Sequence, residues 1–114
     1  IKEAVTTKKI ILHSTLDSEK DYVYIDDLVQ LIPKIISSNK FQVYNIASGY
    51  NISSNKIIDE IIHLTDCKLE IASDAKKFSS GQINIDRIKN EFNFEPTRII
   101  DKIKELVEFY QNSN

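Results

Sequence analysis

The sequence predicts an α/β protein in which short strands alternate with helices along its 114 residues. Short runs rich in β-branched and aromatic residues, such as residues 22–25, are typical of strands. Other segments repeat isoleucine at the spacing of one helix face, as Ile57, Ile58, Ile61 and Ile62 do. The regular alternation of the two patterns indicates an α/β fold with right-handed crossovers.

Each element is expected at a definite place in the chain. Strands are predicted over residues 10–13, 22–25, 41–47 and 68–72, with a short one just before residue 86. Helices are predicted over residues 27–37 and 53–65 and after residues 86 and 97, and residues 74–81 are expected to be a polar loop. We predict that Ser53, Asp86 and Thr97 are N-caps. The last helix should turn a set of apolar residues inward, namely Ile99, Ile100, Ile103, Leu106, Val107 and Tyr110.

The helix predicted over residues 27–37 is apolar around nearly its whole circumference. Such a helix is either buried or covered by a partner. Pro33 lies inside it and removes a backbone hydrogen bond, so the helix should kink or split there. Asp26 and Asp27 precede the apolar run, where a carboxylate accepts free backbone N–H groups and complements the helix dipole. We favour this capping role over a metal site or an acid–base pair.

The composition is that of a globular protein of one domain, with 41% hydrophobic and 28% charged residues. The net charge is −2, whereas a nucleic-acid partner usually requires a basic excess, so none is expected. No apolar run reaches the ~18 residues of a membrane span, and the first residues do not resemble a signal peptide. With one cysteine, Cys67, and no disulfide framework, a cytoplasmic protein without a membrane partner is expected.

No self-sufficient catalytic apparatus is predicted. The two glycines, Gly49 and Gly81, cannot form a dinucleotide-binding loop or a P-loop. No tyrosine is followed four residues later by lysine. His13 and His63 lack a third ligand, so a structural or surface role is expected for both, and Cys67 is expected to be a small buried side chain. We therefore predict no catalytic, cofactor-binding or metal-binding residue in this chain.

Three segments, taken in order, resemble one family. They are "KDYVYIDDLVQLI" at residues 20–32, "VYNIASGYNISSNKIIDEI" at 43–61 and "INIDRIKNEFNFEPTRIIDKIKELVEFY" at 83–110. The first resembles the Arg-Asp-aromatic segment of extended short-chain dehydrogenases, the nucleotide-sugar epimerases and dehydratases. The second resembles their Tyr-Asn-apolar-Gly/Ala segment with its Ser-capped helix, and the third their closing Asp…aromatic-x-Pro pattern. The resemblance covers nearly the whole chain.

The resemblance implies that residues 1–114 are a single C-terminal, substrate-binding region of such an NAD(P)-dependent isomerase or lyase. The absence of methionine and the start at Ile1 also suggest a piece of a longer protein. An N-terminal Rossmann part would then bind NAD or NADP and carry the catalytic Tyr-x-x-x-Lys pair. The isolated chain is expected to be inactive and to bind no cofactor.

The resemblance also implies a role for three lysines and three polar residues. Lys20 stands where the family often has an arginine that grips the substrate's diphosphate. Lys76 and Lys77 are the cations nearest to a second family arginine. We predict that these three lysines contact a nucleotide-sugar substrate. The remaining motif residues, Asp21, Asp27 and Asn45, are interpreted as positioning residues.

Two alternatives remain open from the sequence. One is a reductase or dehydratase of the same superfamily that acts on a different ketone or alcohol. The other is a standalone α/β interaction module without a small-molecule site. In either enzyme reading, the helix over residues 27–37 should pack one face on the nucleotide-binding part. We therefore expect the isolated chain to self-associate through this helix or the strand beside it.

Overall fold

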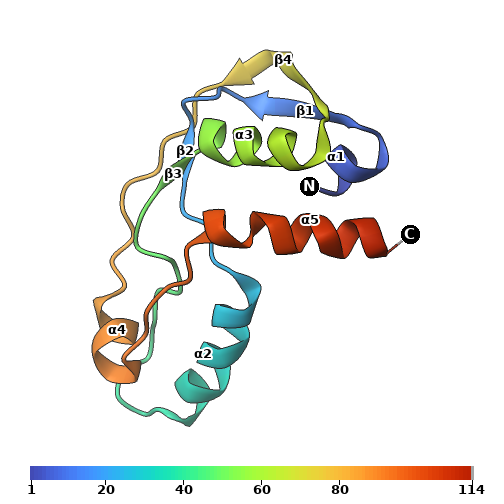
Figure 1. Cartoon of the computed structure of the whole chain (residues 1–114). Helices are drawn as coiled ribbons and strands as arrows, with labels where there is room; N and C mark the ends of the chain where they lie inside the picture. Colours follow the sequence, from blue (N-terminus) through green and yellow to red (C-terminus); the bar gives the residue numbers. More distant parts are fainter. Residues whose placement is uncertain (114) are drawn as a thin grey trace.

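The computed structural model describes residues 1–113 and has a mixed α/β fold, as predicted. Its elements are α1 (Lys2–Thr6), β1 (Lys9–Ser14), β2 (Glu19–Lys20), α2 (Ile25–Ser37), β3 (Ile52–Ser53), α3 (Ser54–Thr65), β4 (Lys68–Lys76), α4 (Asp86–Phe92), a 3-10 turn η1 (Ile99–Lys102) and α5 (Ile103–Asn112). Figure 1 shows an upper lobe around β1, β4, α3 and α5 and a lower lobe formed by α2 and α4.

The upper lobe is built on two parallel strands. β1 pairs with β4 in the register Lys9↔Lys68 to Leu12↔Ile71, and the register shifts before Ser14. α3 lies against this sheet and α5 packs beneath α3 (Figure 1). The buried core of this lobe consists of Ala4, Ile10, Ile58, Ile61, Cys67, Ile103 and Val107. The isoleucine stripe of α3 thus faces inward, and Cys67 is buried, as the sequence predicted.

The lower lobe has a separate, smaller core. Leu31 of α2 and Ile88 of α4 meet Ala47 and Ile85, which lie in extended segments without strand partners. Overall the molecule is thin, with extents of 47 × 33 × 18 Å. Its radius of gyration is 16.3 Å, whereas a compact domain of this length has ~13 Å. A chain of this shape leaves much of its apolar surface uncovered.

Several predicted strands are wrong. Residues 22–24 have no strand partner and Ile25 already begins α2, while residues 41–47 and 83–85 form no strand. A strand requires a neighbour, and within residues 1–113 the pairing next to these segments is limited to the short antiparallel pair of β2 with β3 and an isolated bridge between Glu19 and Ser79. β1 is confirmed, and β4 is longer than predicted, extending to Lys76 through part of the expected polar loop. The short helix α1 was not predicted.

The helix ends also differ from prediction. α2 runs unbroken through Pro33, so this proline does not split the helix. Ser53 is the N-cap residue of α3, although its side chain makes no capping hydrogen bond. Asp86 is the first residue of α4 rather than its cap. Thr97 does not cap the last helix either: Arg98 precedes η1, and the Thr97 hydroxyl is engaged by Asp27.

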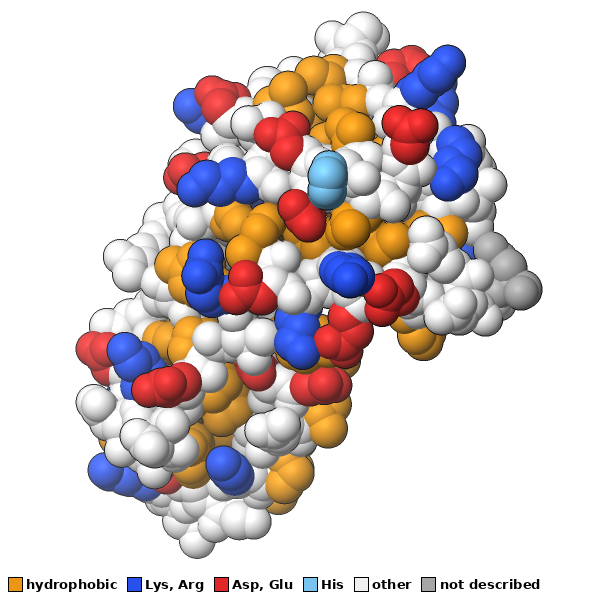
Figure 2. Space-filling model, in the orientation of Figure 1, with side chains coloured by type: hydrophobic (Ala, Val, Ile, Leu, Met, Phe, Trp, Pro, Cys, Tyr) orange, Lys and Arg blue, Asp and Glu red, His pale blue; other side chains and the backbone are white. Residues whose placement is uncertain are grey.

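One face of α2 is left uncovered. Leu31 is buried, whereas Ile25, Val29, Ile32 and Ile36 are 56%, 59%, 42% and 76% exposed. These four residues recur every three or four positions and so form one stripe along the helix. Figure 2 shows apolar side chains reaching the surface along the edge of the lower lobe. The nearly all-round apolar helix therefore packs one face on its own core and exposes the other, which we call the α2 stripe.

Candidate functional site

Two of the three predicted substrate-binding lysines lie on neighbouring segments. Lys20 ends β2, and Lys77 directly follows β4. The two segments are joined by a hydrogen bond from the Glu19 N–H to the Phe78 carbonyl, 2.9 Å long. This connection links residues that are almost sixty positions apart in the sequence. Lys76 ends β4 beside them and is exposed.

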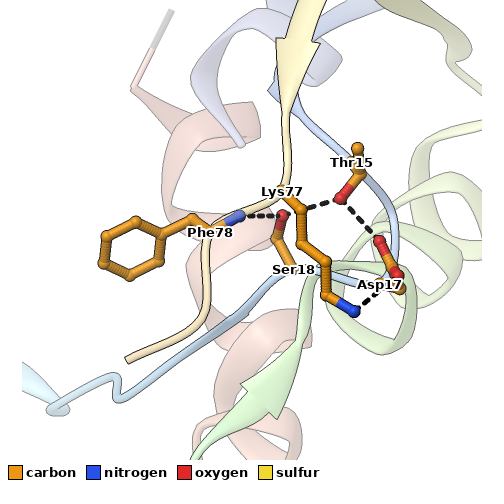
Figure 3. A network of polar contacts seen from close by, with 5 residues as sticks. All are labelled: Thr15, Asp17, Ser18, Lys77 and Phe78. Atoms are coloured by element: carbon orange, nitrogen blue, oxygen red, sulfur yellow. Dashed lines mark hydrogen bonds and ion pairs between the residues drawn. The ribbon is translucent and has the colours of Figure 1, made fainter. Parts of the chain in front are cut away.

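A buried serine fixes the backbone at this junction. The Ser18 side chain is fully buried. Its hydroxyl oxygen accepts a hydrogen bond from the Phe78 N–H at 2.9 Å and lies 2.9 Å from the Thr15 hydroxyl (Figure 3). The Ser18 hydroxyl contacts both Phe78 and Thr15, so it connects the two chain segments beyond Lys76, where the pairing of β1 with β4 ends. The loop carrying Lys77 and Phe78 is thereby held against the loop carrying Ser18 and Lys20.

Lys77 is paired within the chain. Its Nζ lies 2.9 Å from a carboxylate oxygen of Asp17, whose other oxygen accepts a 2.6 Å hydrogen bond from Thr15 (Figure 3). These contacts, first from Thr15 and then from Lys77, lower the pKa of Asp17. The Asp17 carboxylate in turn raises the pKa of Lys77. Both side chains are more than half exposed, and such pairs are weak, so an anionic ligand can compete for Lys77 at small cost.

Lys20 lies over an exposed aromatic ring. Its Nζ is 5.1 Å from the centroid of Phe78, a ring that is 48% exposed. A cation at this distance is attracted to the ring face. Lys77 and Phe78 project in opposite directions (Figure 3), as successive residues of extended backbone do. The arrangement offers an exposed cation and a flat apolar surface side by side. Sequence reasoning missed Phe78 and Ser18, because their partners are remote in the chain.

The three motif residues interpreted as positioning residues tie the three motifs to one another. Asp21, in the first motif, accepts hydrogen bonds of 2.8 Å from the N–H groups of Ser48 and Gly49 in the second. Asn45, in the second, donates to the Asn84 carbonyl at 3.0 Å in the third. The similarity of three separated segments to one family thus corresponds to a set of side-chain contacts between them.

Asp27 closes this set and corrects the predicted capping role. Its two carboxylate oxygens accept hydrogen bonds of 2.7 Å each from the Thr97 N–H and the Thr97 hydroxyl. Neither Asp26 nor Asp27 caps α2, because Tyr24 is the N-cap residue and no side-chain capping bond is made there. Both aspartates lie in the first turn, so they still suit the helix dipole. The buried one of the pair binds the loop before η1 instead of its own helix.

Two further carboxylates, those of Glu105 and Glu91, accept hydrogen bonds from side chains that are remote in the sequence. Glu105 of α5 accepts a 2.7 Å hydrogen bond from the buried Tyr24 hydroxyl and one of 2.9 Å from Lys102. The hydrogen bond to Glu105, with burial, raises the pKa of Tyr24 to about 12. In the lower lobe Glu91 of α4 accepts hydrogen bonds from the Ser38 and Tyr44 hydroxyls. These two hydroxyls hold the pKa of Glu91 below its usual value.

Neither a cluster of metal-ligating side chains nor a glycine-rich nucleotide loop is found among the described residues. Within residues 1–113 no three His, Cys, Asp or Glu side chains lie close enough to hold a metal ion. Both histidines are exposed. The loops after the parallel strands β1 and β4 are "TLDSE" and "KFSSGQ" and lack the glycine-rich turn that cradles a pyrophosphate. No helix in this part of the chain is long and apolar enough to cross a bilayer.

Comparison with solved structures shows what fold these residues adopt. The structure of dTDP-glucose 4,6-dehydratase from Bacillus anthracis in complex with NAD matches 96% of this chain with a TM-score of 0.80 and 23% identity. UDP-glucose 4-epimerase from Thermotoga maritima, with UDP-glucose, matches 98% with a TM-score of 0.78 and 18% identity. The ADP-L-glycero-D-manno-heptose-6-epimerase of Helicobacter pylori matches 98% with a TM-score of 0.71 and 24% identity.

This chain therefore has the fold of part of the NAD-dependent sugar-nucleotide dehydratases and epimerases, and the resemblance predicted from three motifs is confirmed at the level of fold. It spans 37%, 38% and 34% of the three matched chains. No family model matches the sequence, and no curated protein matches it.

Proposed function

We propose that this chain is the C-terminal, substrate-binding region of a cytoplasmic, NAD(P)-dependent nucleotide-sugar epimerase or dehydratase, an isomerase or a lyase. The observation that carries the proposal is the fold match over nearly the whole chain to enzymes of this kind, of which the chain spans little more than a third. The thin shape and the uncovered α2 stripe also suit a region that packs against more protein. NAD or NADP would be bound by the nucleotide-binding part, which lies outside these residues.

In this proposal the substrate's phosphates are bound by Lys20, with Lys76 and Lys77 as neighbouring cations. Lys20 is exposed, and among residues 1–113 its ammonium group makes no ion pair and contacts the Phe78 ring. Lys77 reaches a phosphate only after leaving Asp17, and the exposure of that pair makes the exchange easy. A lysine gives a compact charge where a guanidinium would give a bidentate grip. These lysines bind and orient the substrate, and the chain supplies no group that reacts with it.

The test is a substitution in the longer enzyme that carries this chain. Lys20→Ala should raise KM about tenfold, or ~1.4 kcal/mol, while kcat changes little, because a phosphate contact is equally strong in the ground and transition states. Lys104→Ala, which removes an exposed lysine of α5, is the matched control and should leave both constants unchanged. Unaltered kinetics in Lys20→Ala would reject the contact.

The cofactor assignment has its own test in the isolated chain. Calorimetric titration with NAD+ should show no binding in the micromolar range, a range that corresponds to about −8 kcal/mol. Micromolar binding would contradict the proposed division of the enzyme. A reductase of the same superfamily with another substrate would give the same result, and only a screen of carbonyl and alcohol substrates separates the two.

The other candidate is a standalone α/β interaction module, favoured by the exposed α2 stripe alone. The gene sequence upstream of Ile1 distinguishes it from the enzyme. A glycine-rich strand–helix turn and a Tyr-x-x-x-Lys pair upstream support the enzyme, whereas their absence supports the module.

A further inference from the structure

A cavity of about 450 Å³ is formed by the start of α3, the residues just before it and the start of η1. It is lined by Tyr50, Asn51, Ile52, Lys56, Arg98 and Ile100. None of the three lysines assigned to the substrate belongs to this lining. Its volume is within the range of small-molecule sites. The cavity thus does not include these lysines, although Ile52 in its lining is the strand partner of Lys20.

The charges along this cavity are both positive. Lys56 lies on the first turns of α3, is exposed and makes no ion pair within residues 1–113. The Arg98 guanidinium approaches Asp101 only at 4.0 Å, and both side chains are largely exposed. Such a contact holds the arginine weakly. Two cations that share a cavity without a lining carboxylate favour an anion between them.

The walls of the same cavity are apolar. Ile52 and Ile100 are both partly buried and face the cavity with the ring of Tyr50. The Tyr50 hydroxyl is buried and has no hydrogen-bond partner among the described residues. Because this oxygen has almost no accessible surface, it does not face the open cavity and is not a donor to a ligand bound there. A simple inorganic anion would leave the two isoleucines unused.

We propose that this cavity binds a small anion with an apolar body, such as a phosphate or carboxylate attached to a ring. Lys56 and Arg98 hold the anionic group, and Ile52 and Ile100 cover the apolar part. Arginine provides the bidentate contact and lysine a point charge, a combination that suits either acid. The proposal does not depend on the nucleotide-sugar function proposed above.

The test is a titration of the isotope-labelled chain followed by nuclear magnetic resonance. Phenyl phosphate, benzoate and inorganic phosphate are the three probes. We expect phenyl phosphate or benzoate to shift the amide signals of residues 50–52, 56 and 98–100 in a saturable manner, and the tighter of the two identifies the anionic group. Inorganic phosphate should bind at least about tenfold more weakly. Equal binding of inorganic phosphate, or no saturable shift, would overturn the proposal.

Substitutions locate the site. Lys56→Gln and Arg98→Gln should each weaken the better probe by about tenfold, or ~1.4 kcal/mol, and both residues are exposed enough for the fold to persist. Lys104→Gln on α5 is the matched loss of one charge and should have no effect. Lys20→Ala should also leave this titration unchanged, which separates failure of this site from failure of the substrate site. Equal weakening by all four substitutions would mean non-specific charge attraction and would refute the proposal.

Discussion

Two copies of this chain should associate through the α2 stripe. The exposed fractions of Ile25, Val29, Ile32 and Ile36 together amount to about 2.3 whole side chains. Burying an aliphatic side chain contributes ~1.5–3 kcal/mol, so a symmetric contact that covers both stripes gains ~7–14 kcal/mol. Association costs ~4–15 kcal/mol, and the cost should be near the lower end because the stripe lies on a formed helix. The expected dissociation constant is micromolar to millimolar, or about −8 to −4 kcal/mol.

The perturbation is the double substitution Val29→Lys and Ile32→Lys. It removes about one buried side chain per copy and sets like charges against each other, so the dimer should weaken by at least about a hundredfold, or ~2.8 kcal/mol. Ile11→Lys is the matched control, because Ile11 is a 43% exposed apolar residue of β1 outside the stripe.

Sedimentation equilibrium across a dilution series up to several hundred micromolar measures the association directly. The unchanged chain and Ile11→Lys should gain mass with concentration, whereas the double variant should stay monomeric. A monomer at every concentration of the unchanged chain would refute the reasoning. So would an association that survives the double substitution, because the stripe would then not be the interface.

Three further predictions concern the framework of the site. Gly49 has φ +82 and an added Cβ would lie 3.0 Å from the Ile85 side chain, so Gly49→Ala should lower the free energy of unfolding by ~1–2 kcal/mol or more, as measured in urea. Gly81→Ala, with open space around it, should not lower it; equal losses would contradict this account. Asp27→Asn replaces an acceptor of the Thr97 N–H and should cost ~1.5–3 kcal/mol, whereas the exposed neighbour Asp26→Asn should cost little; the reverse order would restore the capping role. The pKa of Glu91 is lowered in the folded chain, so its stabilising contribution is complete above the ordinary value of 4.5 and disappears as pH falls through the lowered pKa. In thermal unfolding, the stability of Glu91→Gln should therefore fall less steeply with acid than that of the unchanged chain. Parallel losses of stability in the two proteins would exclude the effect.

The local sequence pattern was sufficient to predict elements whose backbone hydrogen bonds are made within the element itself. The α3 helix could be predicted because its hydrogen bonds are internal and its isoleucines share one face, which points to a core wherever that core lies. The same reasoning found the uncovered side of α2, because a helix apolar on all sides cannot bury every side in so thin a molecule. The strands that were wrongly predicted at residues 22–25 and 41–47 show the limit of this approach. Their composition suits a strand, but a strand exists only if another segment lies alongside it.

At the candidate site, too, the sequence predicted some features and the tertiary contacts added others. The sequence singled out Lys20, Lys76 and Lys77 as substrate contacts, which stays a prediction, and the order of the three motifs indicated the fold. It could not show that Asp27 binds Thr97, seventy residues away, or that Lys77 is paired with Asp17. Residue type and local spacing were therefore determined by the sequence alone. The partner of each polar group was decided only by the tertiary structure, because a hydrogen bond depends on distances of about 3 Å between atoms that the folded chain brings together.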